Sequence, residues 1–144
     1  MTATATITYT SDLADVAADQ LVGFFEGWPT APSPDTHLAI LLSSSYAVIA
    51  RDGSTVVGVV TALSDGILAA YVPLLEVRAD YRGQGIGSEL VRRVLAHFSD
   101  LYMVDLLCDS DLQPFYARLG FEPATGAAIR AYVNQAGRAP AAVR

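Results

Sequence analysis

The 144-residue chain contains no lysine and only one cysteine, Cys108. Without lysine it cannot carry the Gly-Lys-Ser/Thr end of an ATP- or GTP-binding loop. One cysteine excludes an internal disulfide and any zinc site that needs several cysteines. The two histidines, His37 and His97, are too few and too scattered for a metal site. The sequence therefore predicts a protein without a bound metal.

Long hydrophobic runs and an excess of positive charge are also missing. No apolar run approaches the length that spans a bilayer, and the start MTATATITYT lacks the features of a secretory signal. The net charge of −6 argues against a nucleic-acid-binding surface. We therefore expect a cytoplasmic protein that binds neither membrane nor nucleic acid. The length and the 52% hydrophobic content predict one domain, residues 1–133, followed by a flexible tail, residues 134–144.

The most informative stretch of the chain is residues 74–95, LLEVRADYRGQGIGSELVRRVL. An extended apolar run leads into a glycine cluster, and an amphipathic helical pattern follows. Gly83, Gly85 and Gly87 thus fall in a strand-to-helix turn, where glycine tolerates positive φ and close backbone approach. The free N–H groups and the dipole at a helix N-terminus favour phosphate oxygens, and Arg82 adds a cation. The pattern predicts a loop that binds a diphosphate.

A dinucleotide-binding fingerprint is the weaker interpretation of this loop. It requires G-x-G-x-x-G after a first strand, with an acidic residue about 20 positions later. Asp105 falls at a tolerable distance, but the third glycine is misplaced and the motif lies past the middle of the chain.

Two motifs fit a different family. Arg82-Gly83-Gln84-Gly85-Ile86-Gly87 resembles the R-x-x-G-x-G acetyl-CoA pyrophosphate loop of the GNAT N-acetyltransferase superfamily, and Phe115-Tyr116-Ala117-Arg118-Leu119-Gly120-Phe121 resembles its late aromatic motif. The resemblance covers roughly residues 12–132 and is strongest to small, single-domain members. It implies an α/β (α+β) fold, the GNAT fold. In that fold a mixed sheet of about six to seven strands is flanked by about four helices, with splayed fourth and fifth strands.

The same resemblance implies the ligands. Acetyl-CoA would be the cosubstrate, the acceptor a primary amine, chiefly of a small molecule, and the acetyl group would pass directly in a ternary complex. Dimerisation is common in the family, so a homodimer is compatible with the resemblance. The cofactor-binding positions implied are Leu75 and Val77, for the pantetheine amides, and Arg82, Gly83, Gln84, Gly85, Ile86, Gly87 and Ser88, for the pyrophosphate.

Tyr116 and Glu76 are the candidate catalytic residues. The family's matching tyrosine protonates the departing thiolate, and a phenol of pKa about 10 can serve a thiol of pKa near 8.5. A core aromatic with a satisfied hydroxyl is the structural alternative. Glu76 is the candidate general base, because its neighbours Leu75 and Val77 share the core face and Glu76 projects to the other. A structural acid paired with an arginine or a tyrosine is equally compatible.

Several further residues have open roles. Tyr71, Asp105 or an ordered water could replace Glu76 as the base. Trp28 and Tyr71 are candidate substrate contacts, although Trp28 could equally form a hydrophobic staple, a packing contact with the first helix. Asp109 stands where many members have an asparagine, which puts that cofactor contact in doubt. A non-catalytic acyl-CoA sensor and a protein or peptide amine acetyltransferase remain the alternative functions.

Local patterns predict the following elements. Strands are expected at Ile7–Thr10, Tyr46–Ala50, Thr55–Leu63, Leu68–Val77 and Leu101–Cys108, with a closing hairpin of Phe121–Ala124 and Ala128–Val133. Helices are expected from Ser11 or Asp12 to Phe25, from Ser33 to Leu42, from Ile86 to Phe98, and from Asp111 to Gly120. The strand Leu101–Cys108 is nearly all apolar, which predicts a central position in the sheet.

Overall fold

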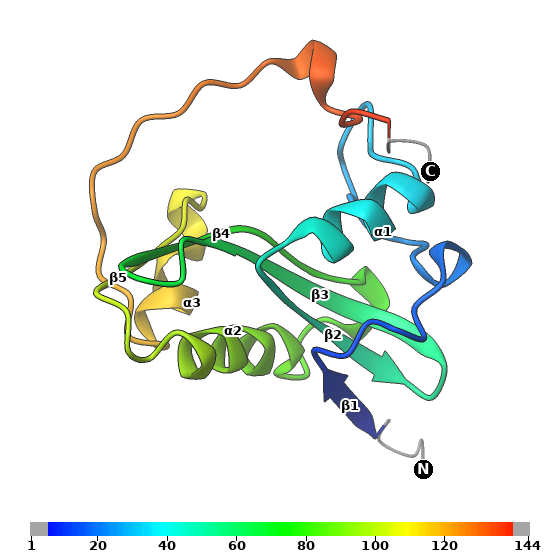
Figure 1. Ribbon diagram of the computed structural model, residues 1–144, viewed down its shortest axis with the longest axis horizontal. Helices are drawn as coiled ribbons and strands as arrows, with labels where there is room; N and C mark the ends of the chain where they lie inside the picture. The colour runs from blue at the N-terminus through cyan, green and yellow to red at the C-terminus, as the bar shows by residue number, and fades with distance from the viewer. Residues whose placement is uncertain (1–5, 140–144) are drawn as a thin grey trace.

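The computed structural model describes residues 6–139 and consists of one twisted sheet with helices on both faces (Figure 1). The sheet has the order β1-β2-β3-β4-β5. Strands β1 to β4 are antiparallel neighbours, and β5 runs parallel to β4. The strands are β1 (Ile7–Thr10), β2 (Tyr46–Asp52), β3 (Thr55–Ser64), β4 (Ala69–Val77) and β5 (Met103–Asp105).

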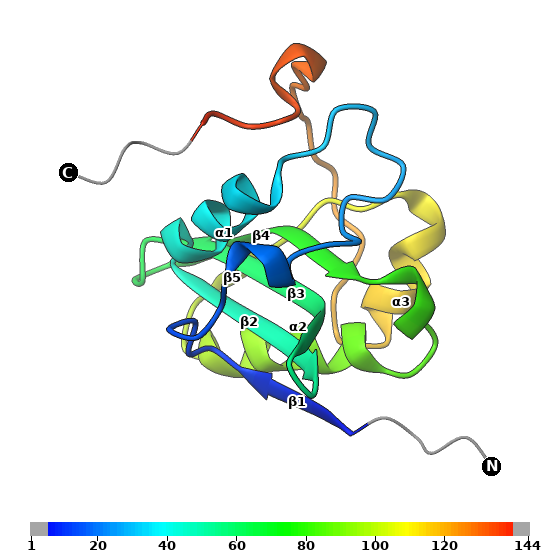
Figure 2. The ribbon, with the colours of Figure 1, turned by 90° about the vertical axis from the view of Figure 1, so that its right-hand side faces the viewer.

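The described residues contain three α-helices, α1 (Pro34–Ser43), α2 (Ile86–His97) and α3 (Gln113–Ala117). Helices α1 and α2 cover opposite faces of the sheet (Figure 2). Short 3₁₀ turns occupy Ala18–Gln20, Ala79–Tyr81, Ser110–Leu112 and Tyr132–Asn134. None of the helices in this part of the chain is both long and apolar enough to cross a membrane.

Two apolar clusters form the core, one on each face. Beneath α2, the buried Leu90 and Val94 pack on Val48, Val60 and Val72 of the sheet. Beneath α1, Leu41 packs with the buried side chains of Leu21, Ile49 and Val59. The β-branched residues of β2 and β3 alternate between these clusters, which is why both strands are buried on both faces.

Several elements match the predictions from the sequence. Ser33 caps α1 by accepting a hydrogen bond from the N–H of Thr36, and Pro34 occupies the first turn. The hairpin between β2 and β3 turns at Gly53, which has φ of 62°. The face of α2 that was expected to be apolar is buried at Ile86, Leu90, Val91, Val94 and Phe98, the last being the residue that caps the helix.

The predicted helix from residue 11 or 12 to Phe25 is wrong, because only one 3₁₀ turn forms there. Local side-chain bonds replace the helical ones: the Asp12 carboxylate accepts the N–H of Ala14, and the Gln20 amide oxygen accepts the N–H of Ala17. Gly23 then adopts a left-handed φ of 84°, which a regular helix does not accommodate. Side chains that offer the backbone such partners compete directly with helix formation.

The C-terminal third also differs from the prediction. The fifth strand is three residues long rather than eight, and within residues 6–139 it lies at the edge of the sheet. The predicted closing hairpin is wrong, since residues 122–131 form no strand. The sheet therefore has five strands instead of six to seven, and three α-helices stand where about four were expected. The last helix is shorter than the predicted span from Asp111 to Gly120, because α3 covers only Gln113–Ala117, with Leu112 and not Asp111 as its N-cap. Gly120 has the expected positive φ, 100°, but lies two residues beyond the C-cap, Arg118.

Candidate active site

Strands β4 and β5 separate after a short stretch of pairing. Their register runs from Ala69 opposite Met103 to Tyr71 opposite Asp105 and ends there. Beyond that point a cavity of about 350 Å³ lies between Val72, Pro73 and Leu75 of β4 and the segment after β5. The predicted splay of the fourth and fifth strands is thus present, and it opens a cleft in the sheet.

Pro73 lies in a β-bulge at the start of this divergence. On β3 the register passes from Thr61 to Leu63, whereas on β4 it passes from Leu74 to Tyr71, so that Val72 and Pro73 together oppose one residue. A proline has no N–H to donate, which suits a position without a ladder partner.

The backbone beyond the bulge faces the cleft at Leu75 and Val77. The N–H of Arg78 donates to the carbonyl of Val57, so residues 57 and 78 are a hydrogen-bonded pair. Hydrogen-bonded and non-hydrogen-bonded pairs alternate along an antiparallel ladder such as β3–β4. Residues 74 and 76 then bond to β3, and the main-chain groups of Leu75 and Val77 point away from it. Both side chains pack in the core beneath α2. This arrangement leaves both main-chain groups of Leu75 and the N–H of Val77 outside the β3 ladder, available for an extended ligand such as a pantetheine arm, whereas the carbonyl of Val77 accepts a hydrogen bond from Arg82.

The glycine loop connects β4 to α2 with two left-handed residues. Gly83 has φ of 78°, and Gly85, the N-cap of α2, has φ of 82°. The carbonyl of Gly85 already accepts the N–H of Glu89, so Ile86, Gly87 and Ser88 present the first N–H groups of the helix. The buried side chain of Ile86 anchors this end of α2 to the sheet. The loop thus has the geometry of a phosphate-binding helix N-terminus.

Arg82 lies beside this loop but is engaged within the protein. Its Nε donates to the carbonyl of Val77 at 3.1 Å, and its guanidinium pairs with Glu26 at 2.8 Å. More than half of each charged side chain is exposed, so the ion pair contributes little to stability. An anionic ligand can therefore replace Glu26 as the partner of Arg82.

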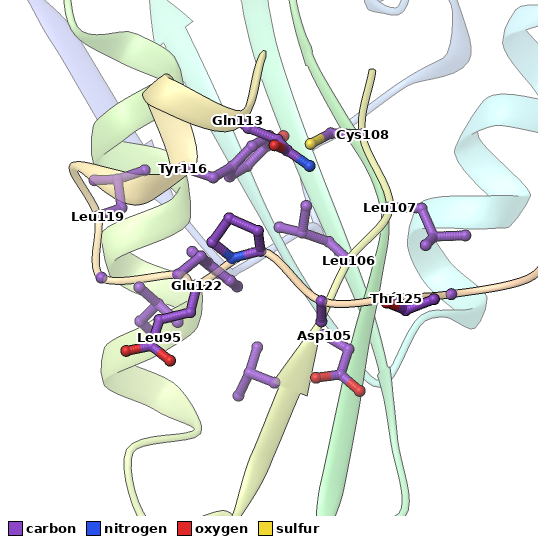
Figure 3. A pocket seen from close by; sticks show the side chains of 16 residues that line it. Leu95, Asp105, Leu106, Leu107, Cys108, Gln113, Tyr116, Leu119, Glu122 and Thr125 are labelled. Atoms are coloured by element: carbon purple, nitrogen blue, oxygen red, sulfur yellow. The ribbon is translucent and has the colours of Figure 1, made fainter. Parts of the chain in front are cut away.

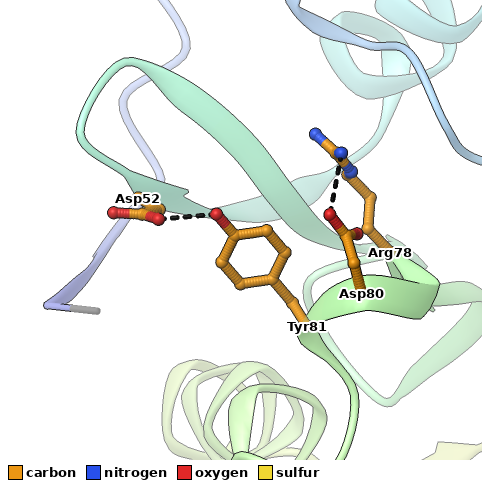
Figure 4. A network of polar contacts seen from close by, with 4 residues as sticks. All are labelled: Asp52, Arg78, Asp80 and Tyr81. Atoms are coloured by element: carbon orange, nitrogen blue, oxygen red, sulfur yellow. Dashed lines mark hydrogen bonds and ion pairs between the residues drawn. The ribbon is translucent and has the colours of Figure 1, made fainter. Parts of the chain in front are cut away.

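The turn before the glycine loop is held by two polar contacts (Figure 4). The hydroxyl of Tyr81 donates to Asp52 of β2 at 2.6 Å, and Arg78 pairs with Asp80 at 3.1 Å. The first contact ties the loop to the β2–β3 hairpin, so the loop is fixed on a rigid element of the sheet.

Tyr116 of α3 stands at the wall of the cleft, together with Cys108. Its ring packs edge-on against Phe115 at 4.9 Å and Phe121 at 5.7 Å between ring centroids. Burial raises the pKa of the Tyr116 phenol, and the nearby Cys108 thiol raises it further. The phenol is therefore protonated at neutral pH and can act as a proton donor.

Glu76 projects to the face opposite Leu75 and Val77, as predicted. One carboxylate oxygen accepts the N–H of Phe25 at 2.9 Å, and the other is buried without a partner among the described residues. Burial raises the pKa of this carboxyl, against smaller opposing effects of the Phe25 hydrogen bond and of Arg82. A purely structural role for Glu76 would pair it with an arginine or a tyrosine, and neither is among these hydrogen-bond partners in the described residues. Glu76 lines neither this cleft nor the larger cavity beside β5.

Phe25 is a feature of the site that sequence reasoning missed. It is buried and has φ of 59°, a left-handed conformation that is uncommon for a bulky residue. Its ring packs against Trp28 at 4.9 Å and against the buried His37 at 4.7 Å. The loop that carries Trp28 is thus fastened to Glu76 through the backbone of Phe25. No sequence signal marks a non-glycine residue for positive φ.

Tyr71 and Asp105, the other candidate bases, are register partners where β4 and β5 part. Asp105 lines the cavity beside β5, and Tyr71 is partly exposed. Asp109 precedes the 3₁₀ turn at Ser110–Leu112, and its carbonyl accepts the N–H of Leu112. Residues 6–139 contain no cluster of three metal-ligating side chains.

Comparison with known proteins agrees with this geometry. The chain is 54% identical to a proposed acetyltransferase from Deinococcus radiodurans R1, whose crystal structure superposes with a TM-score of 0.90 over 94% of each chain. Arabidopsis thaliana Naa50, in complex with the bisubstrate analogue CoA-Ac-MVNAL, has the same fold at 21% identity, with a TM-score of 0.63 over 83% of this chain and 85% of that one.

A curated relative from Glycine max, histone acetyltransferase TAP1, is 29% identical over 110 residues, which are 67% of this chain and 47% of the relative. The chain spans less than half the length of the curated relatives it matches. The profile of the acetyltransferase (GNAT) family matches residues 13–121, which include the glycine loop, Tyr116 and the residues that line the cleft except Arg130. The chain therefore belongs to the GNAT family of acetyltransferases.

Proposed function

We propose that the protein transfers an acetyl group from acetyl-CoA to the primary amine of a small molecule. The observation that carries this proposal is the cleft between β4 and β5, with the main-chain groups of Leu75 and the N–H of Val77 on the β4 side and Tyr116 on the other. An extended pantetheine arm fits such a cleft. The pyrophosphate would lie against the N–H groups that begin α2, next to Arg82.

Tyr116 would supply the proton for the departing thiolate, because its phenol lies at the cleft and burial raises its pKa. Glu76 would take the proton of the attacking ammonium, directly or through a water. Its raised pKa brings the carboxyl closer to the range in which a base works at neutral pH. The Phe25–Trp28 loop covers this carboxylate, so the amine would reach it by displacing the loop. Trp28 and Tyr71 would then border the acceptor.

A thermal unfolding series tests the ligand assignment. Acetyl-CoA, NAD and ATP are each added at the same concentration, and the midpoint Tm is compared with that of the protein alone. A ligand at 100 times its Kd adds about 2.7 kcal/mol, which raises Tm by a few degrees in a domain of this size. A shift with acetyl-CoA alone is expected. A shift with NAD or ATP only, or no shift with any ligand, would contradict the proposal.

The acceptor class is tested by release of CoA thiol in the presence of amines. Small polyamines and amino acids are compared with short peptides that carry a free N-terminus or a lysine side chain. Turnover with small amines supports the proposal. Turnover with peptides alone would transfer the assignment to a protein acetyltransferase, the activity in the name of the soybean relative. Acetyl-CoA binding without turnover on any amine would indicate a sensor domain.

A further inference from the structure

One cation lines the cleft in which the proposed acetyl transfer takes place. Arg130 lies on the extended segment after Phe121, which in Figure 1 passes from the α3 side of the molecule to the α1 side. It lines the cavity of about 350 Å³ together with Pro73 and Tyr116. Arg130 is therefore a wall residue of the space that holds the proposed proton donor.

A larger cavity of about 550 Å³ adjoins this cleft, and its charged wall residues are all acidic (Figure 3). Cys108 and Tyr116 line both cavities. In Figure 3 these two residues lie toward one end of the larger cavity, and Asp105 and Glu122 lie toward the other. Among the described residues that line either cavity, Arg130 is the only cation. An anionic group that enters this region therefore has one place at which to pair.

Arg130 has no charged partner in the part of the chain that the structure describes. Four ion pairs are present there, and none of them includes this residue. Its one hydrogen bond among the described residues joins Nη1 to the adjacent carbonyl of Ile129 at 3.4 Å, which is long for such a bond. A guanidinium can hold both oxygens of a carboxylate through two parallel hydrogen bonds. Arg130 therefore offers the cleft a binding group for a carboxylate.

The position of Arg130 separates it from the proposed site of the cofactor's phosphates. The glycine loop follows Val77, and no residue of that loop lines the cavity in which Arg130 lies. Pro73 precedes Val77 by four residues, which corresponds to about 13 Å along a strand. An extended arm that starts at the glycine loop would thus have its reactive end near Pro73 and Tyr116. A carboxylate at Arg130 then belongs to a group beside the thioester.

The segment that carries Arg130 is fastened to the loop that carries Trp28. The N–H of Thr30 in that loop donates to the side chain of Gln135 at 3.1 Å. A short 3₁₀ turn, Tyr132–Asn134, connects Arg130 to this contact. The cation at the cleft and the loop with a candidate acceptor contact are therefore held together, as expected if both meet the same small molecule.

We propose that Arg130 binds the carboxylate of the acceptor, and that the acceptor is an amino acid. This inference rests on the proposed function, which makes the ligand an amine. One carbon separates the nitrogen of an amino acid from its carboxylate, so a carboxylate held at the cleft wall brings the nitrogen next to the thioester. Leu75, Leu107 and Leu112 of the same wall suit an apolar side chain.

The product of this transfer is an N-acetyl amino acid. A new N–C bond replaces the C–S bond of the thioester, the base takes the proton of the amine, and the thiolate takes the proton of Tyr116. Arg130 acts in this scheme only by binding the carboxylate, so it sets specificity and donates no proton.

The test compares amino acids with the amines that remain when the carboxylate is removed. Leucine is paired with isopentylamine and phenylalanine with phenethylamine, and the ratio of kcat/KM within each pair is measured. The change of this ratio on substitution cancels the different basicities of the two amines. We expect the ratio to fall roughly 10-fold or more in Arg130→Gln, because a charge-assisted contact is lost. The fall should be smaller in Arg130→Lys, which keeps the charge but not the paired N–H groups.

Arg92→Gln is the matched control. The side chain of Arg92 is 61% exposed on α2, and the residue lines neither cavity. This variant should leave the ratio unchanged, and Arg130→Gln should leave the Kd of acetyl-CoA unchanged. An increase of that Kd with an equal loss for both members of each pair would mean that Arg130 binds the cofactor, which would overturn the inference.

A second series replaces acetyl-CoA with succinyl-CoA, because an acyl chain can also supply a carboxylate beside the thioester. If Arg130→Gln lowers kcat/KM for succinyl-CoA and spares the preference for amino acids, the carboxylate belongs to the donor and the inference is wrong.

A binding measurement separates this inference from acetyl transfer itself. Each amine is titrated calorimetrically into wild type and Arg130→Gln loaded with CoA, which carries no acetyl group. Tighter binding of the amino acid than of its paired amine, lost in Arg130→Gln, supports the carboxylate site. If no amine is then acetylated, only the proposed function fails. Equal or absent binding within each pair, or a preference that survives in Arg130→Gln, overturns the inference.

Discussion

At the scale of single residues, Tyr116 and Glu76 differ in their position relative to the cleft. Tyr116 lines the cleft itself, whereas Glu76 lies outside the cleft and accepts the N–H of Phe25, in the loop that carries Trp28. Both groups favour the protonated form more than in water, since burial raises the pKa of each. A tyrosine with a raised pKa remains a donor at neutral pH, while a glutamate with a raised pKa becomes a stronger base once ionised. The two shifts therefore suit opposite roles in one transfer.

Tyr116→Phe removes the phenolic proton and keeps the ring between Phe115 and Phe121. We expect kcat to fall about 10²-fold or more, because a positioned general acid contributes roughly that factor. The Kd for acetyl-CoA should stay within about twofold, since the ring still fills the wall of the cleft. Steady-state kinetics and calorimetric titration measure the two quantities. Tyr102→Phe, at a tyrosine that is 77% exposed, is the control and should change neither. Full kcat in Tyr116→Phe would remove the acid role.

Glu76→Gln tests the base through the pH dependence of the rate. Glutamine can still accept the N–H of Phe25 but cannot take up a proton. In the wild type we expect kcat/KM to rise with pH along a limb that reports the raised pKa of Glu76. That limb should disappear in Glu76→Gln and persist in Asp105→Asn. If the limb is lost only in Asp105→Asn, the base is Asp105; if it survives in both variants, neither carboxylate is the base.

At the scale of elements, the position of the glycine loop depends on how closely α2 approaches β3. A Cβ added at Gly58 would lie 3.0 Å from Cγ2 of Ile86 and 3.1 Å from Cδ1 of Leu90. Both side chains are buried, so they must move by a few tenths of an ångström to admit a methyl group, which strains the packing of the first turns of α2 on β3. The N–H groups that would hold the pyrophosphate belong to this part of the helix.

We therefore predict that Gly58→Ala lowers the free energy of unfolding by about 1–3 kcal/mol, the usual cost of overpacking a core. Gly87→Ala is the matched control, because its Cβ would meet Phe115 at an ordinary 3.5 Å. Alanine is also the better helix former, so the control should be neutral or slightly more stable. Urea denaturation of the two variants measures the difference. Equal stabilities would show that α2 can shift without cost.

The elements that the sequence predicted well are those with local signals. Ser33 and Pro34 mark the start of α1, and Gly53 marks the turn between β2 and β3. The two GNAT-like motifs are also local signals, and they led to the cleft and to Tyr116. The prediction of a helix over residues 11–25 failed because the side chains of Asp12 and Gln20 accept backbone N–H groups there. The prediction of a closing hairpin failed because an alternating pattern does not show whether a strand finds a partner, and residues 122–130 make no backbone hydrogen bond to another backbone group among the described residues.

At the scale of the whole molecule, His37 makes the free energy of unfolding depend on pH. The side chain is 1% exposed, lies between Phe24 and Phe25, and has no hydrogen-bond partner on either ring nitrogen among the described residues. Burial lowers its pKa from 6.5 to about 4. The folded protein thus holds His37, on the buried face of α1, in its neutral form at pH values where the unfolded chain would already bind a proton.

The sign of the pH effect follows from proton binding. Between pH 6.5 and about 4 the unfolded state binds more protons at His37 than the folded state, so this residue destabilises the fold as the pH falls. The full loss would be roughly 3 kcal/mol for a shift of this size. Glu76 acts in the opposite direction, because its raised pKa lets the folded state bind a proton more readily above pH 4.5.

His37→Leu separates the two effects, because leucine fills the apolar site and does not titrate. We expect the free energy of unfolding of the wild type, measured with urea, to fall more steeply between pH 6.5 and 4 than that of the variant. The remaining slope of the variant should be flatter or reversed, since the effect of Glu76 is then no longer opposed by His37. Parallel slopes for the two proteins would mean that His37 is protonated in the folded state, and that the Phe24–Phe25 loop opens as the pH falls.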